Sequence, residues 1–179
     1  MAEFITFDEI RYLNERSYSR LLIEKAEKQY KSGSTFLSYS TLDDEYLPTI
    51  IGILENHGAS VYIDKKDPKL PQITDQSTAA ILRENIALTS KFVLFVTPNS
   101  KESNWIPWEL GLADGEKTNS KVALFPAAER KFDQHWAKQE YLGLYDQIVW
   151  GHFEDKQNEW LVLNHEKNTA VPLGHWIRG

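Results

Sequence analysis

The feature that most constrains the fold is a nearly unbroken run of apolar residues in the middle of the chain. Residues 92–96 read Phe-Val-Leu-Phe-Val, without the polar alternation of a strand that has one face in water. Such a run is typical of a strand buried on both faces, as in a parallel sheet covered by helices. We therefore expect an α/β architecture in which further strands and helices alternate around this segment.

Shorter apolar segments repeat the strand pattern on either side, and segments of helical spacing separate them. The expected strands lie at residues 35–39, 59–63, 92–96 and 122–125, and the expected helices at residues 43–57, 78–89 and 103–117. This order, βαβαβαβ, predicts a flavodoxin-like three-layer α/β domain. Its central parallel sheet should carry helices on both faces, joined by right-handed crossovers.

The two ends of the chain fit this alternation less well. Residues 1–33 combine helical spacing with many charged side chains, so we expect an N-terminal helical extension there and the main domain over residues 34–179. Beyond Pro126, residues 147–150 resemble a further strand and residues 132–142 a helix. The last thirty residues fit no single pattern.

Composition excludes several classes of function. The 179 residues include no cysteine, which rules out a disulfide framework and a zinc site built on sulfur. A net charge of −6 argues against nucleic acid as a partner, because counterion release needs clustered Lys and Arg. The longest apolar run is too short to span a bilayer, and the acidic start lacks the basic region of a signal peptide. We expect a cytoplasmic protein that does not bind membranes.

Common cofactor and metal motifs are missing from the sequence. The five histidines show no HExxH or comparable spacing, so we expect no metal site. There is also no GxGxxG motif, no P-loop and no nucleophile elbow. If a dinucleotide binds, it is therefore expected as a substrate and not as a retained redox cofactor.

The strongest candidate site lies in residues 103–110, Ser-Asn-Trp-Ile-Pro-Trp-Glu-Leu. Pro107 fits best in the first turn of a helix, which keeps Glu109 close to the helix start. Trp105 and Glu109 are four residues apart and share one helix face, so an aromatic ring and a carboxylate can meet the same ligand. The first turns of this helix should rise from the carboxyl edge of the sheet, where ligands of open α/β folds bind.

Together these segments resemble the Toll/interleukin-1 receptor (TIR) domain family, especially its bacterial and plant members that consume NAD. The strongest match runs from Asn99 and Ser100 through Ser103, Trp105, Glu109 and Leu110. It is joined by residues 36–40 on the first expected strand, 58–64 on the second, and 81–90 before the strand at 92–96. In this order the matches cover residues 34–125, which is more specific than any one motif alone.

The resemblance implies roles for individual residues. It implies that Glu109 is the catalytic residue of an NAD glycohydrolase and that Trp105 helps to form the nucleotide pocket. Further candidates for substrate binding are Ser38, Tyr39, Ser40, Asp64 and Ser103. Hydroxyl groups at a strand end also cap nearby backbone, and an Asp at a strand end also stabilises turns, so both interpretations stay open for these residues.

One carboxylate suffices for the implied chemistry. Nicotinamide is a cationic pyridinium in NAD and departs neutral, so cleavage of its ribosyl bond needs no general acid, unlike ordinary glycoside cleavage. Glu109 would hold the ribose hydroxyls and stabilise the oxocarbenium-like sugar. Attack by water then gives ADP-ribose, whereas attack by an adenine nitrogen of the same molecule gives a cyclic ADP-ribose isomer.

The resemblance also implies self-association and a setting in antiphage immunity, with a downstream effector that senses the nucleotide product. The expected loop over residues 64–77 corresponds to the family's BB loop, but Leu-Pro-Gln-Ile at residues 70–73 departs from the glycine that many members have there. Two alternatives stay open. One is a non-catalytic TIR adaptor that acts by TIR–TIR docking, and the other is an enzyme similar to nucleoside deoxyribosyltransferases.

Overall fold

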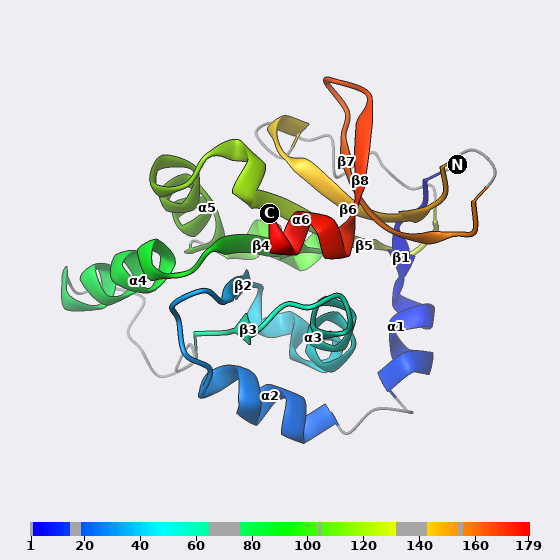
Figure 1. Cartoon of the computed structure of the whole chain (residues 1–179). Helices are drawn as coiled ribbons and strands as arrows, with labels where there is room; N and C mark the ends of the chain where they lie inside the picture. The colour runs from blue at the N-terminus through cyan, green and yellow to red at the C-terminus, as the bar shows by residue number, and fades with distance from the viewer. Residues whose placement is uncertain (1, 15–18, 65–75, 104, 132–142, 154–155) are drawn as a thin grey trace.

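The computed structural model of the chain describes residues 2–14, 19–64, 76–103, 105–131, 143–153 and 156–179 (Figure 1). The strands are β1 (Ile5–Thr6), β2 (Thr35–Ser38), β3 (Val61–Tyr62), β4 (Lys91–Val96), β5 (Val122–Ala128), β6 (Asp146–Gly151), β7 (Glu159–Asn164) and β8 (Thr169–Pro172). The α-helices are α1 (Phe7–Asn14), α2 (Ser19–Glu27), α3 (Leu47–Asn56), α4 (Gln76–Leu88), α5 (Trp105–Glu116) and α6 (Leu173–Arg178). Short 3₁₀ helices are η1 (Thr41–Tyr46), η2 (Pro98–Glu102) and η3 (Asn119–Lys121).

The described strands form one mixed sheet in the order β3-β2-β4-β5-β6-β7-β8. The pairs from β3 to β6 are parallel, and β7 and β8 are added antiparallel. β4 is buried along its whole length, in agreement with its apolar sequence. The α/β class, the parallel core of the sheet and the strand-helix alternation are therefore confirmed.

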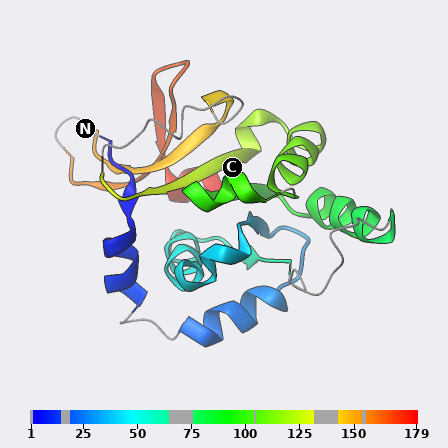
Figure 2. The ribbon, with the colours of Figure 1, turned by 180° about the vertical axis from the view of Figure 1, so that it is seen from behind.

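The sheet separates two apolar cores. On one face, α4 and α5 pack over Phe36, Phe92 and Leu124. On the other face, α3 packs together with parts of α1, α2 and α6, and Figure 2 shows these layers from behind. The alternation of side chains along each strand supplies both cores, because successive residues point to opposite faces.

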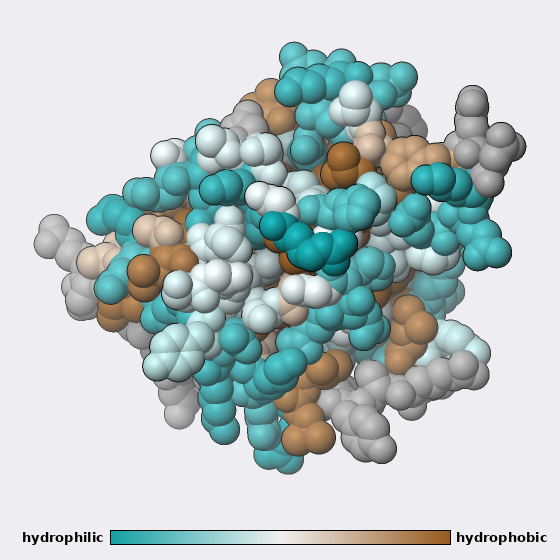
Figure 3. All heavy atoms as spheres, in the orientation of Figure 1, coloured by the Kyte–Doolittle hydropathy of each residue, from teal (hydrophilic) through white to brown (hydrophobic). Residues whose placement is uncertain are grey.

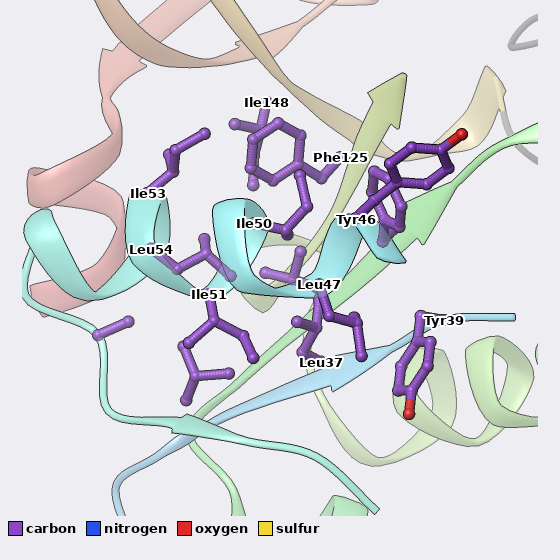
Figure 4. Close-up of a cluster of buried hydrophobic side chains, with 14 of the residues drawn as sticks. Leu37, Tyr39, Tyr46, Leu47, Ile50, Ile51, Ile53, Leu54, Phe125 and Ile148 are labelled. Carbon is purple, nitrogen blue, oxygen red and sulfur yellow. The ribbon is translucent and has the colours of Figure 1, made fainter. Parts of the chain in front are cut away.

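Helix α3 is the most completely buried helix of the described residues. Seven of its residues are buried, among them Leu47, Ile50 and Leu54, and Figure 4 shows Ile50 next to Phe125 and Ile148 of the sheet. The helix ends before Gly58, whose φ of +98° lies in the left-handed region that favours glycine. The helix end predicted at this glycine is confirmed.

Residues 1–33 contain the expected helices and, in addition, a strand. β1 pairs with the end of β5, with Ile5 opposite Ala127, and Ile10 of α1 is fully buried in the core on the α3 face. The division of the chain at residue 33 stays a prediction, but the described part of this extension is packed into the core of the main domain.

The chain after Pro126 forms strands and a helix that were only partly predicted from the sequence. The strand predicted at residues 147–150 is confirmed as β6, whereas the helix predicted at 132–142 lies outside the described residues. Most of the last thirty residues form the antiparallel pair β7 and β8 and the helix α6. Among the described residues, no helix combines the length and apolar character needed to cross a membrane.

Candidate active site

Helix α5 carries Glu109 at the carboxyl edge of the sheet. The helix begins at Trp105, and Pro107 lies in its first turn, as predicted. The hydroxyl of Ser103 accepts a hydrogen bond from the backbone N–H of Ile106 at 3.4 Å, which helps to cap the first turn. Since α5 follows the carboxyl end of β4 through η2, Glu109 lies within two turns of that edge.

The carboxylate of Glu109 is fully buried and meets the end of β2. The Ser38 hydroxyl donates a hydrogen bond to Oε2 of Glu109. Ser38 pairs with Leu94 of β4, so the parallel pairing of β2 and β4 brings it beneath α5. Among the hydroxyls predicted at this strand end, that of Ser38 contacts Glu109.

A second buried carboxylate connects the two loops that flank this pair. Asp43 of η1 is fully buried and accepts hydrogen bonds from the Thr97 hydroxyl and the Asn99 side-chain amide, both at 2.7 Å. Burial raises the pKa of the Asp43 carboxyl, and the bonds from Thr97 and Asn99 partly oppose that rise. This cluster joins the loop after β2 to the loop that leads into α5, and so restrains Ser38 relative to Glu109.

The two tryptophans of α5 lie against each other at the start of the helix. The rings of Trp105 and Trp108 meet edge to face, with 5.7 Å between their centroids. Both are partly buried and pack against the apolar core beneath α4 and α5. Trp105 therefore lies one turn from Glu109, where its half-exposed ring can contact a ligand.

The other predicted site residues are distributed differently. Tyr39 belongs to the core on the α3 face, and burial followed by the charge of Asp44 raises the pKa of its phenol. The hydroxyl of Ser40 caps η1 by accepting from the backbone N–H of Leu42 at 3.4 Å. Asp64 is half-buried and accepts a 3.4 Å hydrogen bond from the Tyr62 hydroxyl. The substrate contacts predicted for Tyr39, Ser40 and Asp64 stay predictions, and the structure gives each a local partner.

Sequence reasoning missed the cluster of Asp43, Thr97 and Asn99. Asp43 was placed only at the start of the helix expected at residues 43–57, because Asn99 lies 56 residues further along the chain. The available signal was positional: polar residues follow the ends of two strands that the βαβ order makes neighbours. Among the described residues, no group of three or more His, Asp or Glu side chains could hold a metal ion.

The arrangement can stabilise positive charge on a bound molecule. A buried carboxylate in a low-dielectric environment interacts more strongly with a developing cation than it would in water. The Ser38 hydroxyl fixes one of its oxygens, and the aromatic pair at the start of α5 offers a flat apolar surface beside it.

Comparison with known proteins connects this geometry to a family. The sequence profile of the TIR domain matches residues 35–161. The chain is 31% identical over 172 residues to a protein of Bacillus cereus (strain MSX-D12) named "Probable 3' cyclic ADP-D-ribose synthase ThsB'", and the match covers 93% of this chain and 88% of that protein.

Proposed function

The chain belongs to the TIR domain family, and from this premise we propose that it is an enzyme that cleaves the nicotinamide–ribose bond of NAD. Glu109 is the catalytic residue of this proposal. The observation that carries it is the buried carboxylate at the carboxyl edge of the sheet, held by Ser38 and flanked by the aromatic start of α5. NAD is the substrate in this scheme, and no resident cofactor is required.

The bond that breaks joins the anomeric carbon of the ribose to the pyridinium nitrogen. Its electron pair leaves with nicotinamide, which becomes neutral, and the ribose acquires oxocarbenium character. The Glu109 carboxylate stabilises this positive charge, a type of interaction worth about 3 kcal/mol in comparable sites. Attack by water, which loses its proton to solvent, gives ADP-ribose. Attack by a nucleophilic atom of the same dinucleotide gives a cyclic ADP-ribose.

The name of the Bacillus cereus relative favours the cyclic product. We propose that this chain makes a cyclic ADP-ribose signal, with hydrolysis to ADP-ribose as the competing outcome. A partner of matching chemistry would be a downstream effector that binds this nucleotide. The proposed setting is bacterial antiphage immunity in the cytoplasm, with activity in a homo-oligomer formed through TIR–TIR contacts.

The burial of Glu109 adds a requirement to the proposal. A carboxylate with no exposed surface cannot touch a dinucleotide until the atoms that cover it move. Binding of NAD therefore has to be coupled to opening of the site, which fits a family in which self-association is expected to switch activity on.

The direct test is release of nicotinamide from NAD by the purified chain, measured by chromatography at several protein concentrations. Glu109→Gln keeps an oxygen that can accept from Ser38 but removes the negative charge, so we expect a loss of about 100- to 1,000-fold. Chromatography of the same reactions separates ADP-ribose from cyclic products.

Glu116→Gln is the matched control, because it makes the same change at an exposed position of the same helix. It should retain wild-type activity. Equal rates for wild type and Glu109→Gln would refute the assignment of Glu109. No nicotinamide release at any concentration would favour the adaptor alternative, and base exchange on deoxynucleosides with NAD untouched would favour the deoxyribosyltransferase-like one.

A further inference from the structure

A pocket of about 380 Å³ lies at the amino edge of the sheet, away from Glu109. It is lined by Thr35 and Lys91 at the starts of β2 and β4, by residues just before β3, and by the end of α6. β2 continues from Thr35 to Ser38, the residue that contacts Glu109. Because strands rise about 3.3 Å per residue, the pocket and Glu109 are separated by about 10 Å or more along the sheet.

Three cationic side chains and no acidic side chain line this pocket: Lys91, Lys121 and Arg178. None of the three forms an ion pair with a described carboxylate. Figure 3 views the molecule from the side on which the chain ends, and mainly hydrophilic and neutral residues surround that end. The charged side chains of the pocket are therefore all cationic on a chain whose net charge is −6, and Gly179, the last residue of the chain, lines the pocket beside them.

Lys91 is the most informative of the three. The residue is only 4% exposed, and its Nζ lies 4.8 Å from the centroid of the Trp176 ring. Its Nζ donates no hydrogen bond to a described residue. Burial, followed by the charge of Lys121, lowers the pKa of the Lys91 ammonium. A buried ammonium with only a ring beside it and a like charge nearby is poorly compensated.

Lys117 is a second buried lysine, and hydrogen bonds compensate its charge. Its Nζ donates to the backbone carbonyls of Ile86 and Thr89 at 2.6 and 2.5 Å. Lys117 therefore has a structural function at the end of α4. Lys91 has no such bonds, and it lines a pocket large enough to admit a ligand.

We infer that this pocket binds a small phosphate-bearing anion, with Lys91 at its base and Lys121 and Arg178 at its rim. Ammonium and guanidinium groups form their strongest hydrogen bonds with such oxygens. The inference is independent of the proposed activity, because the pocket and Glu109 share no residue.

Pyrophosphate is the first probe, titrated into the full chain by calorimetry at constant ionic strength. We expect saturable binding, weakened about tenfold by Lys121→Gln and by Arg178→Gln, since each removes one charge-assisted contact. AMP and ADP are then titrated in the same way. Tighter binding of the nucleotides than of pyrophosphate would identify a nucleotide site, and the reverse a site for free phosphate groups.

Anion binding should also raise the Tm of the wild-type chain. Lys91→Met keeps the length of the aliphatic side chain and the contact with Trp176 but removes the ammonium, so it should lose most of this rise. Lys167→Gln is the matched control, at an exposed position in the turn between β7 and β8. Glu109→Gln should bind the anion as wild type does. No saturable binding of any of the three anions, or an equal weakening in Lys167→Gln, would overturn the inference.

Discussion

At the carboxyl edge of the sheet the buried charged side chains are Asp43 and Glu109, whereas at the amino edge they are Lys91 and Lys117. These four are the buried charged residues of the described chain. The carboxylates accept hydrogen bonds from Ser38, Thr97 and Asn99, side chains that follow or end strands. The lysines meet backbone carbonyls and an aromatic ring.

The direction of the helices gives a physical reason for this division. A helix between two parallel strands runs opposite to them, so its N-terminus lies at the carboxyl edge of the sheet and its C-terminus at the amino edge. Helix N-termini carry partial positive charge and C-termini partial negative charge. The first edge therefore favours carboxylates, and the second favours ammonium groups. One fold can therefore bury both signs of charge if each lies at the matching edge.

Burial shifts the pKa values of the charged groups at the two edges in opposite directions. Burial raises the pKa of Asp43 and lowers the pKa of Lys91 and Lys117, because it disfavours the charged form in each case. The hydrogen bonds and the helix ends offset this cost. Substitutions that remove individual partners test how much of the burial cost these interactions offset.

The largest effect on stability is expected at the carboxyl edge. Asp43→Ala leaves the Thr97 hydroxyl and the Asn99 amide without their buried acceptor, which should lower the free energy of unfolding by about 3 kcal/mol. Urea denaturation measures this value. Asp114→Ala, at an exposed position of α5, should cost about 1 kcal/mol or less. Equal costs for the two variants would contradict a special role for the buried cluster.

The raised pKa of Asp43 predicts that the free energy of unfolding depends on pH. The variant Asp43→Asn isolates this contribution. The folded pKa of Asp43 is raised, so the folded state binds the proton more tightly than the unfolded state does. Its contribution to stability is greatest below the unfolded pKa and is lost as pH rises through the folded pKa. The difference in unfolding free energy, wild type minus Asp43→Asn, should therefore decrease as pH rises through that window.

At the amino edge, Lys117→Met should cost about 2 kcal/mol of unfolding free energy, because two buried carbonyls lose a charged donor. The loss is smaller than at Asp43, because the Ile86 carbonyl keeps a hydrogen bond from the Thr89 hydroxyl. Hydrogen exchange should show faster opening of the last turn of α4. Lys167→Met is the exposed control, and unchanged exchange in α4 would show that Lys117 does not hold this helix end.

The smallest effect is expected from Ser38→Ala, which removes the hydrogen bond to Glu109 while leaving the charge. Under the proposed function, kcat should fall about tenfold, corresponding to about 1.4 kcal/mol. Ser40→Ala, whose hydroxyl caps η1, should change kcat less than twofold. An equal loss in both variants would indicate that the whole segment after β2 holds the substrate.

Much of the fold was predictable because its signals are local. The apolar sequence of β4, the helix end before Gly58 and the first-turn position of Pro107 each depend on a few adjacent residues. The strand β7 was missed, although a run of four apolar residues (160–163) precedes a turn in which Asn168 has a φ of +50°. Its antiparallel pairing breaks the βαβ order that guided the prediction.

The sequence by itself determined the alternation of strands and helices, and with it the position of Glu109 near a helix start at the carboxyl edge. Periodicity, caps and proline act over three or four residues, so they can be recognised in a single segment. Only the tertiary structure decided that Ser38, 71 residues away, contacts Glu109 and that Tyr39 turns to the opposite face. It likewise brought Arg178 of the tail and Lys91 to the lining of one pocket. Such contacts depend on which strands are neighbours and in what register, and no short stretch of sequence contains that information.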